Sequence, residues 1–235
     1  MSNRTELPAL RSTVLAATAV LASVSATSCS SVTGQEGEAA AGTHTEEELH
    51  EALLPEFQDA GRVAEQDETG RYAELTAVQQ NDELREEVEL NKPECLDAVE
   101  QWTQMDAVRS APSALASYGR EGEAITHALL GVDGETAADV VATRPPDECS
   151  TYEATDPEGS NTSYELEELD VSELDDAYAL EVHAEGDDHS IRMYSLVYRG
   201  TEHVGMTSVL GPEATDETLV DFAQAAHEHA EENLG

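Results

Sequence analysis

The chain has 235 residues, with 51 Asp and Glu side chains against 11 Lys and Arg, and a formal net charge of -40. A surface this negative repels nucleic-acid phosphates and anionic lipid headgroups, so it excludes nucleic acid as a partner and electrostatic adsorption to a membrane. Leu, Val, Ile and Phe supply just under a fifth of the chain, a level at which a highly charged protein is suspected of disorder.

The first 28 residues have the features of a bacterial export signal. Two arginines precede a run of small and apolar residues over 14–26, too short to cross a bilayer but typical of a secretory core segment. The sequence before Cys29 resembles the lipobox of bacterial lipoproteins, in which the cysteine is acylated and becomes the new N-terminus. We therefore predict diacylglycerol and palmitate on Cys29, and a protein anchored to the outer face of the cell membrane. Cleavage after Ala26 without lipidation is the alternative.

A change in pattern divides the rest of the chain in two. Residues 29–44 are small, polar and acidic, without apolar periodicity, which predicts a flexible tether. Residues 45–235 alternate strand and helix patterns with turn signals between them. Because such consistency is not expected of a solvated tail, we predict one folded α+β domain over this range.

The domain is predicted to open with a short helix. Thr45 and Glu48 have the spacing of a capping box, and Pro55 ends the helix. Residues 58–83 are ambiguous between helix and strand, because "RYAELTAVQQNDELREE", residues 71–87, could be a helix by propensity. The alternation in "LREEVEL", residues 84–90, favours a strand that ends before Pro93.

Apolar residues recur at every third position after Pro93, which predicts a helix that buries one narrow face. The residues in this pattern are Leu96, Val99, Trp102 and Met105.

Paired strands and a helix are expected next. The segments 113–119 and 123–132 are short and apolar, and the residues between them have a hairpin signature. The segment "GETAADVVATRPP", residues 134–146, predicts a helix that is closed by its two prolines.

The last part of the chain predicts a sheet followed by a helix. Strand patterns run over 163–169, 177–186, 190–200 and 202–211, and the tight turns between the last three predict an antiparallel meander. The final helix is amphipathic. Its apolar face consists of Leu219, Phe222, Ala223, Ala226 and Ala230.

Two cysteines remain once Cys29 is assigned to the lipid. An even pair in an exported domain is most simply a disulfide, so we predict a bond between Cys95 and Cys149. Neither has a histidine or second cysteine beside it at the spacing of metal ligands, which disfavours a metal or catalytic role.

The excess of acidic residues indicates adaptation to high salt. Repulsion among about forty uncompensated charges opposes folding at low ionic strength, and molar salt screens it. A saline or alkaline habitat is therefore our hypothesis. An acidic surface that serves only solubility is the alternative.

From about Leu49 to Leu234 the chain resembles the PknH-type extracellular sensor domain of actinobacterial Ser/Thr kinases and related lipoproteins. The resemblance implies a twisted antiparallel sheet flanked by helices, with a cleft, and a sensor-like, ligand-binding role. It also implies that Cys95 and Cys149 match one of the two disulfides of the kinase domains. The second disulfide and a kinase domain are missing here. The residues that carry the resemblance are "VELNKPECLDAV", "GETAADVVA", "PPDEC", "YSLVYRGTEHVGMTSV" and the final helix.

Few side chains stand out as ligand-binding candidates. Tyr194 and Tyr198 share one face of a predicted strand and could line an apolar cleft, although such residues more often belong to the core. His127, His183 and His203 fall on different predicted strands. We interpret them as ordinary strand histidines and expect no metal and no cofactor.

The motifs of known enzymes give no lead, because the sequence contains no nucleophile elbow, phosphate loop or zincin helix. We therefore expect a non-catalytic, lipid-anchored domain that binds a small ligand or an envelope partner. Two alternatives stay open: an envelope hydrolase with acidic catalytic residues, and a structural accessory lipoprotein without a pocket.

Overall fold

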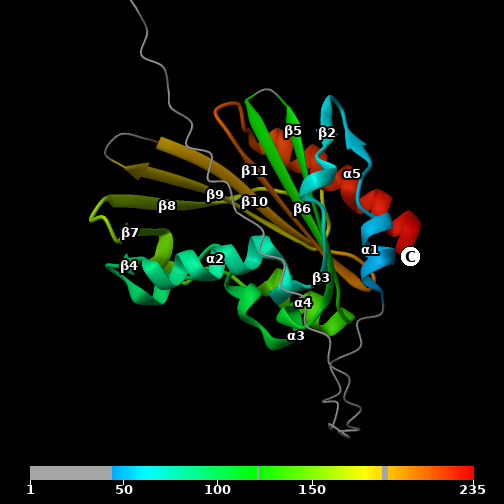
Figure 1. The fold of residues 1–235 in the computed structure, drawn as a ribbon, viewed down its shortest axis with the longest axis horizontal. Coiled ribbons are helices and arrows are strands. Elements are labelled where there is room, and N and C mark those ends of the chain that lie inside the picture. Colours follow the sequence, from blue (N-terminus) through cyan, green and yellow to red (C-terminus); the bar gives the residue numbers. More distant parts are fainter. Residues whose placement is uncertain (1–43, 121, 187–189) are drawn as a thin grey trace, which may run out of the picture. The chain divides into compact units, whose positions relative to one another are not determined.

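The computed structural model describes residues 44–120, 122–186 and 190–235. The predicted signal segment, Cys29 and the tether up to residue 43 lie outside the described residues. The described part is an α+β fold that contains one open, antiparallel sheet of 11 strands and five α-helices (Figure 1). This is the predicted fold class. No described helix has both the length and the apolar character needed to span a membrane.

The elements follow one another along the chain with short 3-10 turns between some of them. The helices are α1 (Glu46–Glu51), α2 (Thr76–Glu87), α3 (Asp106–Arg109), α4 (Gly134–Ala142) and α5 (Asp216–Leu234). The strands are β1 (Glu56–Phe57), β2 (Ala60–Arg62), β3 (Glu68–Arg71), β4 (Glu89–Leu90), β5 (Pro112–Arg120), β6 (Glu123–Gly131), β7 (Thr151–Thr155), β8 (Asn161–Leu169), β9 (Ala177–Gly186), β10 (Ser190–Arg199) and β11 (His203–Leu210).

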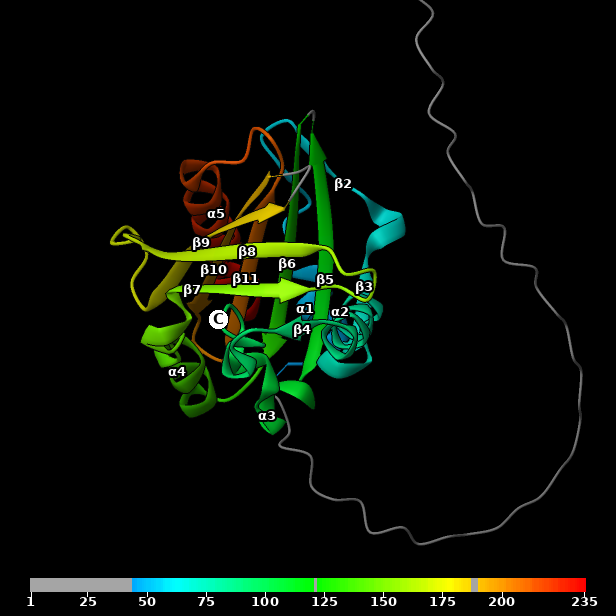
Figure 2. The ribbon, with the colours of Figure 1, turned by 90° about the vertical axis from the view of Figure 1, so that its left-hand side faces the viewer.

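The sheet has the spatial order β1-β2-β5-β6-β11-β10-β9-β8-β7-β4, and β3 also pairs with β5. The predicted hairpin β5–β6 and the predicted meander β9–β10–β11 are both present. Strand β7 lies outside the four strand patterns predicted over 163–211 and follows the turn that contains Cys149. The sheet is strongly twisted, so that β7 and β8 run across the direction of β5 and β6 (Figure 2).

Each face of the sheet has its own hydrophobic core. We call them the α5 face, which carries Leu196 and Tyr198 and is covered by α1 and α5, and the cleft face, which carries Val197 and Met206. Helices α2, α3 and α4 lie on the cleft face (Figure 1). Two-sided burial explains why the central strands are apolar at successive positions rather than alternating.

Both terminal helices of the domain form as predicted. The Thr45 side chain accepts a hydrogen bond from the Glu48 backbone N–H while the Glu48 carboxylate accepts one from the Thr45 backbone, which completes the capping box of α1. In α5 the five residues of the predicted apolar face have no solvent exposure.

The strand predicted over 84–90 is wrong. Residues up to Glu87 belong to α2, and only Glu89 and Leu90 form a strand, which pairs with β7. Alternation over seven residues was misleading because the preceding residues continue a helix of good formers, such as Gln79 and Gln80.

The segment after Pro93 forms short helical turns instead of one helix. It contains 3-10 turns at Pro93–Cys95 and Gln101–Gln104, followed by α3. A period of three is that of the 3-10 helix, in which residues i and i+3 eclipse, whereas an α-helix would need 3.6. Trp102 is buried, but Leu96 at the start of the pattern remains exposed.

The predicted disulfide is present. Cys95 and Cys149 are fully buried, with an S–S distance of 2.06 Å, and they join the 93–109 segment to the turn that leads into β7. Lys92, the only lysine, reinforces this junction because its Nζ donates hydrogen bonds of 2.6 Å to the backbone carbonyls of Glu148 and Thr151.

Candidate ligand-binding cleft

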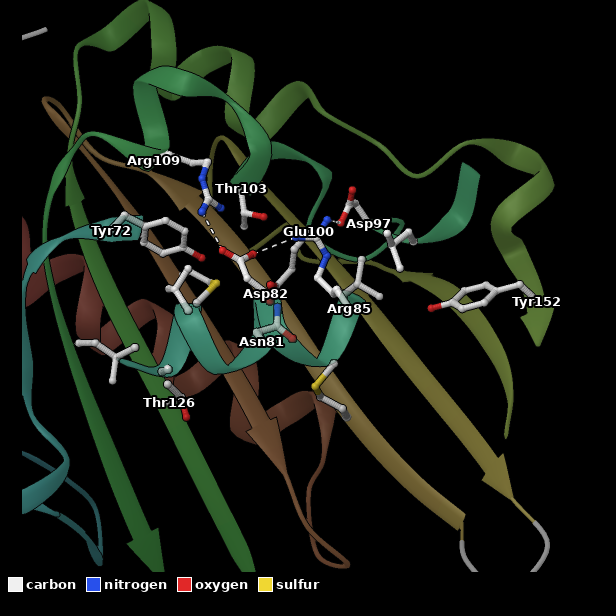
Figure 3. A pocket seen from close by; sticks show the side chains of 17 residues that line it. Tyr72, Asn81, Asp82, Arg85, Asp97, Glu100, Thr103, Arg109, Thr126 and Tyr152 are labelled. Atoms are coloured by element: carbon white, nitrogen blue, oxygen red, sulfur yellow. Dashed lines mark hydrogen bonds and ion pairs between the residues drawn. The ribbon is translucent and has the colours of Figure 1, made fainter. Parts of the chain in front are cut away.

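A cleft of about 350 Å³ lies between α2, the 93–109 segment and the cleft face of the sheet (Figure 3). Its lining comes from parts of the chain that are far apart in sequence. The floor is Leu115 of β5, Thr126 of β6, Met206 of β11 and Met193 of β10, and Tyr152 of β7 closes one end. The twist of the sheet therefore creates this space, because it brings β7 across the ends of the central strands.

The floor and much of the walls are apolar. Met193 and Met206 supply flexible thioether side chains, which adapt to irregular shapes. Val78 of α2 and Val99 of the 93–109 segment add apolar surface to the two walls. An apolar cavity with a few polar groups is the usual form of a small-molecule site.

Helix α2 forms one wall although it buries none of its side chains completely. Its first residues lack a side-chain cap, because the preceding residue is Leu75. Glu68 of β3 takes over this role: its carboxylate accepts hydrogen bonds from the backbone N–H groups of Thr76 and Ala77. A carboxylate is favourable at this end of the helix dipole.

Ion pairs connect α2 to the opposite wall. Asp82 accepts hydrogen bonds from Arg109 Nη2 at 2.7 Å and from Arg85 Nη1 at 2.9 Å, and Arg85 also pairs with Asp97 (Figure 3). Each of these side chains is less than a third exposed. Since α2 has little apolar burial, these pairs are its main attachment across the cleft.

The protonation of two carboxyls in the cleft is shifted in opposite directions. The hydrogen bond from Arg109 lowers the pKa of Asp82, with Arg85 acting in the same sense. Burial raises the pKa of Glu100, although Arg85 opposes this shift. No hydrogen bond or ion pair to the Glu100 carboxylate occurs among the described residues, so this group is the unmatched charge of the cleft.

The only tryptophan of the chain lies beside this cleft. Trp102 is buried, and its ring lies 6.3 Å from the ring of Tyr72, which lines the cleft. Burial raises the pKa of the Tyr72 phenol, which keeps it neutral and able to donate a hydrogen bond. A bound molecule would therefore alter the surroundings of the Tyr72–Trp102 pair.

A second hollow of about 1010 Å³ lies between α4 and the β8–β9 connection. Its lining includes several exposed charged side chains, among them Arg144, Asp170 and Asp175. It is wider than the cleft but offers less apolar enclosure. We therefore take the cleft as the candidate site.

The two tyrosines predicted as ligand candidates lie elsewhere. Tyr194 and Tyr198 are 4% and 0% exposed on the α5 face, and neither lines the cleft. Tyr198 shares a hydrogen bond of 3.1 Å with Nε2 of His127. These tyrosines are therefore core residues, as tyrosines at such strand positions more often are.

The three strand histidines share the α5 face but do not form a ligand set. His127 and His203 are buried, whereas His183 is at the far end of its strand and contacts Ser190. Burial lowers the pKa of His127 to about 3 and that of His203 to about 4. Within the described ranges, no three His, Cys, Asp or Glu side chains are grouped so that they could hold a metal ion.

The sequence alone does not mark the residues that line the cleft. Asp82, Asp97 and Glu100 are three carboxylates among 51 acidic residues, and nothing in their spacing marks them. The basic residues, which are scarce, point to the cleft better than the acidic residues do. With 11 in the whole chain, each arginine inside a folded segment is a candidate for a structural ion pair, and Arg85 and Arg109 both are.

Comparisons with known proteins show a partial likeness of fold. No protein-family model matches the chain, and no curated protein matches it. An uncharacterized protein from Mycobacterium smegmatis is 14% identical with a TM-score of 0.43, over 61% of this chain and 76% of that one. The extracellular domain of PknH from Mycobacterium tuberculosis is 12% identical with a TM-score of 0.44, over 62% and 77%.

A third solved structure, an uncharacterized protein from Bacillus thuringiensis, is 13% identical with a TM-score of 0.25, over 48% of this chain and 95% of that one. Likenesses of this degree carry no argument about function. The resemblance to the PknH-type domain is therefore weak and has no support from a sequence family.

Proposed function

We propose that this chain is a non-catalytic, sensor-like domain that binds a small ligand or an envelope partner through the cleft, and that a lipid on Cys29 holds it at the outer face of the cell membrane. One observation carries the binding role: an apolar cleft of about 350 Å³ has a wall of ion-paired polar side chains. Ligand sites commonly start at about this size and combine an apolar lining with a few polar groups.

Ligand retention tests the binding role. The protein is purified from its own host and weighed by native mass spectrometry, together with Thr126→Phe and Ala124→Phe. Both positions are on β6, two residues apart and therefore on the same face, but only Thr126 lines the cleft. We expect a bound mass on the unmodified protein and on the Ala124 variant, and its loss from the Thr126 variant.

The outcome separates this proposal from the structural alternative. A bare mass for all three proteins, at a concentration where they remain folded, would favour an accessory lipoprotein without a ligand. A bound mass that survives in the Thr126 variant would place the ligand outside the cleft.

The proposed location rests on two features. The buried Cys95–Cys149 disulfide supports an oxidising, extracytoplasmic compartment. The lipobox-like sequence before Cys29 supports the anchor. Intact-mass analysis should find residue 29 at the N-terminus with a lipid attached, and Cys29→Ala should release the protein from the membrane fraction. An unmodified thiol at residue 29 would refute the anchor.

A second candidate is the envelope hydrolase. One observation favours it: the cleft holds a carboxyl whose pKa is lowered and another whose pKa is raised, and such pairs can divide the roles of base and acid. Cell-wall material incubated with the protein tests it. Hydrolysis products that disappear in both Asp82→Asn and Glu100→Gln would replace the non-catalytic proposal with this one.

A further inference from the structure

The cleft carries an excess of negative charge within a largely apolar lining. Its carboxylates are Asp82, Asp97 and Glu100, and its cations are Arg85 and Arg109. One carboxylate therefore has no basic counterpart in the lining. Because the surroundings are apolar, an unpaired charge here is less well solvated than one on the open surface, and a matching charge from a ligand would interact with it strongly.

The charges of the two arginines are already paired with carboxylates. Arg109 is bound to Asp82 at 2.7 Å, and Arg85 is bound to both Asp82 and Asp97. An anion that approached either guanidinium would be repelled by the carboxylates already bound there. Removing one partner of a buried pair leaves the other uncompensated, which is costly. The positive charges of the cleft therefore serve to attach α2 to the 93–109 segment.

Glu100 is the group left over. Its side chain is half-buried, lines the cleft, and has no hydrogen bond or ion pair among the described residues. Cys95 and Ala98, shortly before it in the chain, are buried, and the disulfide fixes this segment to the rest of the domain. The position of Glu100 is therefore set by the fold. The net charge of -40 adds a field that attracts cations and repels anions.

The rest of the lining suits an organic cation better than a metal ion. Leu115, Met193 and Met206 offer apolar surface instead of further oxygen ligands. The Tyr72 ring lines the same space, and the face of an aromatic ring attracts a cation. Both parts of an amphipathic cation therefore find a complementary surface.

We propose that the cleft binds an amphipathic organic cation, with its apolar part on Leu115, Met193 and Met206 and its positive group next to the Glu100 carboxylate. This inference rests on the binding role proposed above and specifies the chemical class of the ligand.

Three probes of equal chain length test the charge: octyltrimethylammonium, octanol and octyl sulfate. Each is titrated as a monomer into the purified full-length chain at one fixed salt concentration, and binding is followed by the fluorescence of Trp102. The variants are Glu100→Gln and, as a matched control, Glu83→Gln. Glu83 is an exposed residue of α2 outside the cleft lining, so both variants lose one negative charge.

We expect octyltrimethylammonium to bind more tightly than octanol, and octyl sulfate to bind least. Glu100→Gln should weaken binding of the cation about tenfold and leave octanol within about twofold, whereas Glu83→Gln should change neither. Melting curves establish that both variants are folded. An effect of Glu83→Gln as large as that of Glu100→Gln would overturn the inference, because the field of the whole protein would then suffice.

The remaining outcomes distinguish this inference from the proposal beneath it. Binding of octanol or octyl sulfate as tight as that of the cation, and blocked by Thr126→Phe, would overturn the charge preference and support the cleft. Binding of the cation that Thr126→Phe leaves unchanged would overturn both. Absence of binding by all three probes would also overturn this inference, and the native-mass experiment would then decide the binding role alone.

Discussion

Protonation of His127 should destabilise the fold as the pH falls below neutrality. The ring has no solvent exposure, its Nε2 shares a hydrogen bond with Tyr198, and its Nδ1 has no partner among the described residues. Burial lowers its pKa from 6.5 to about 3. Repulsion from the charges of His203, Arg62 and His229 also disfavours its protonated form.

The magnitude follows from proton linkage. Above pH 6.5 the ring is neutral in both states and has no pH-dependent effect. Below that value the unfolded chain binds a proton that the folded chain refuses until about pH 3, so the free energy of unfolding falls as the pH falls. The slope is about 1.4 kcal/mol per pH unit, which amounts to about 3 kcal/mol between pH 6 and pH 4.

Urea unfolding followed by Trp102 fluorescence measures this loss. His127→Gln is the reference, because an amide can keep a hydrogen bond with Tyr198 but does not titrate. The measurements are made in molar NaCl, which screens the many surface carboxylates that also titrate in this range. The difference in unfolding free energy between the two proteins should shrink by about 3 kcal/mol from pH 6 to pH 4. If the unfolding free energies of the two proteins changed in parallel with pH, His127 would be accessible to protons or water in the folded state, and the reasoning from its burial would be refuted.

Three further predictions concern stability. Replacing both Cys95 and Cys149 with Ser should cost about 4 kcal/mol of unfolding free energy, because the bond closes a loop with a sequence separation of 54; an unchanged urea midpoint would contradict this. Gly205→Ala should cost about 1–3 kcal/mol, since the new Cβ would lie 2.0 Å from the Tyr198 ring, whereas Gly61→Ala meets no atom within 4 Å and should cost less than about 1 kcal/mol. The melting temperature should rise from low to molar NaCl as carboxylate repulsion is screened, and a constant or falling midpoint would refute salt adaptation.

Much of the fold could be predicted because local patterns agree with the final contacts. The capping box of α1 is complete within four residues, and the apolar face of α5 follows one helical period. The meander was predictable because short turns force neighbouring strands to pair. The disulfide was predictable because only two cysteines lie within the predicted domain.

The failures occur where distant segments decide the structure. Residues 84–90 alternate like a strand, but α2 continues to Glu87, where Arg85 pairs with Asp97 of the opposite wall. The cleft itself could not be predicted, because its floor combines residues of β5, β6, β10 and β11. Glu100 could not be recognised as its unpaired carboxyl, because this depends on which carboxylates Arg85 and Arg109 bind. Neither the pairing of Arg85 with Asp97 nor the meeting of these strands at the cleft can be inferred from neighbouring residues in the sequence.

A crystal structure of the protein purified from its own host would test the central claim most directly. We predict non-protein density between α2 and the cleft face, in contact with Leu115 and Met206 and next to Glu100. A cleft closed by its own side chains, or density bound only elsewhere on the molecule, would contradict it.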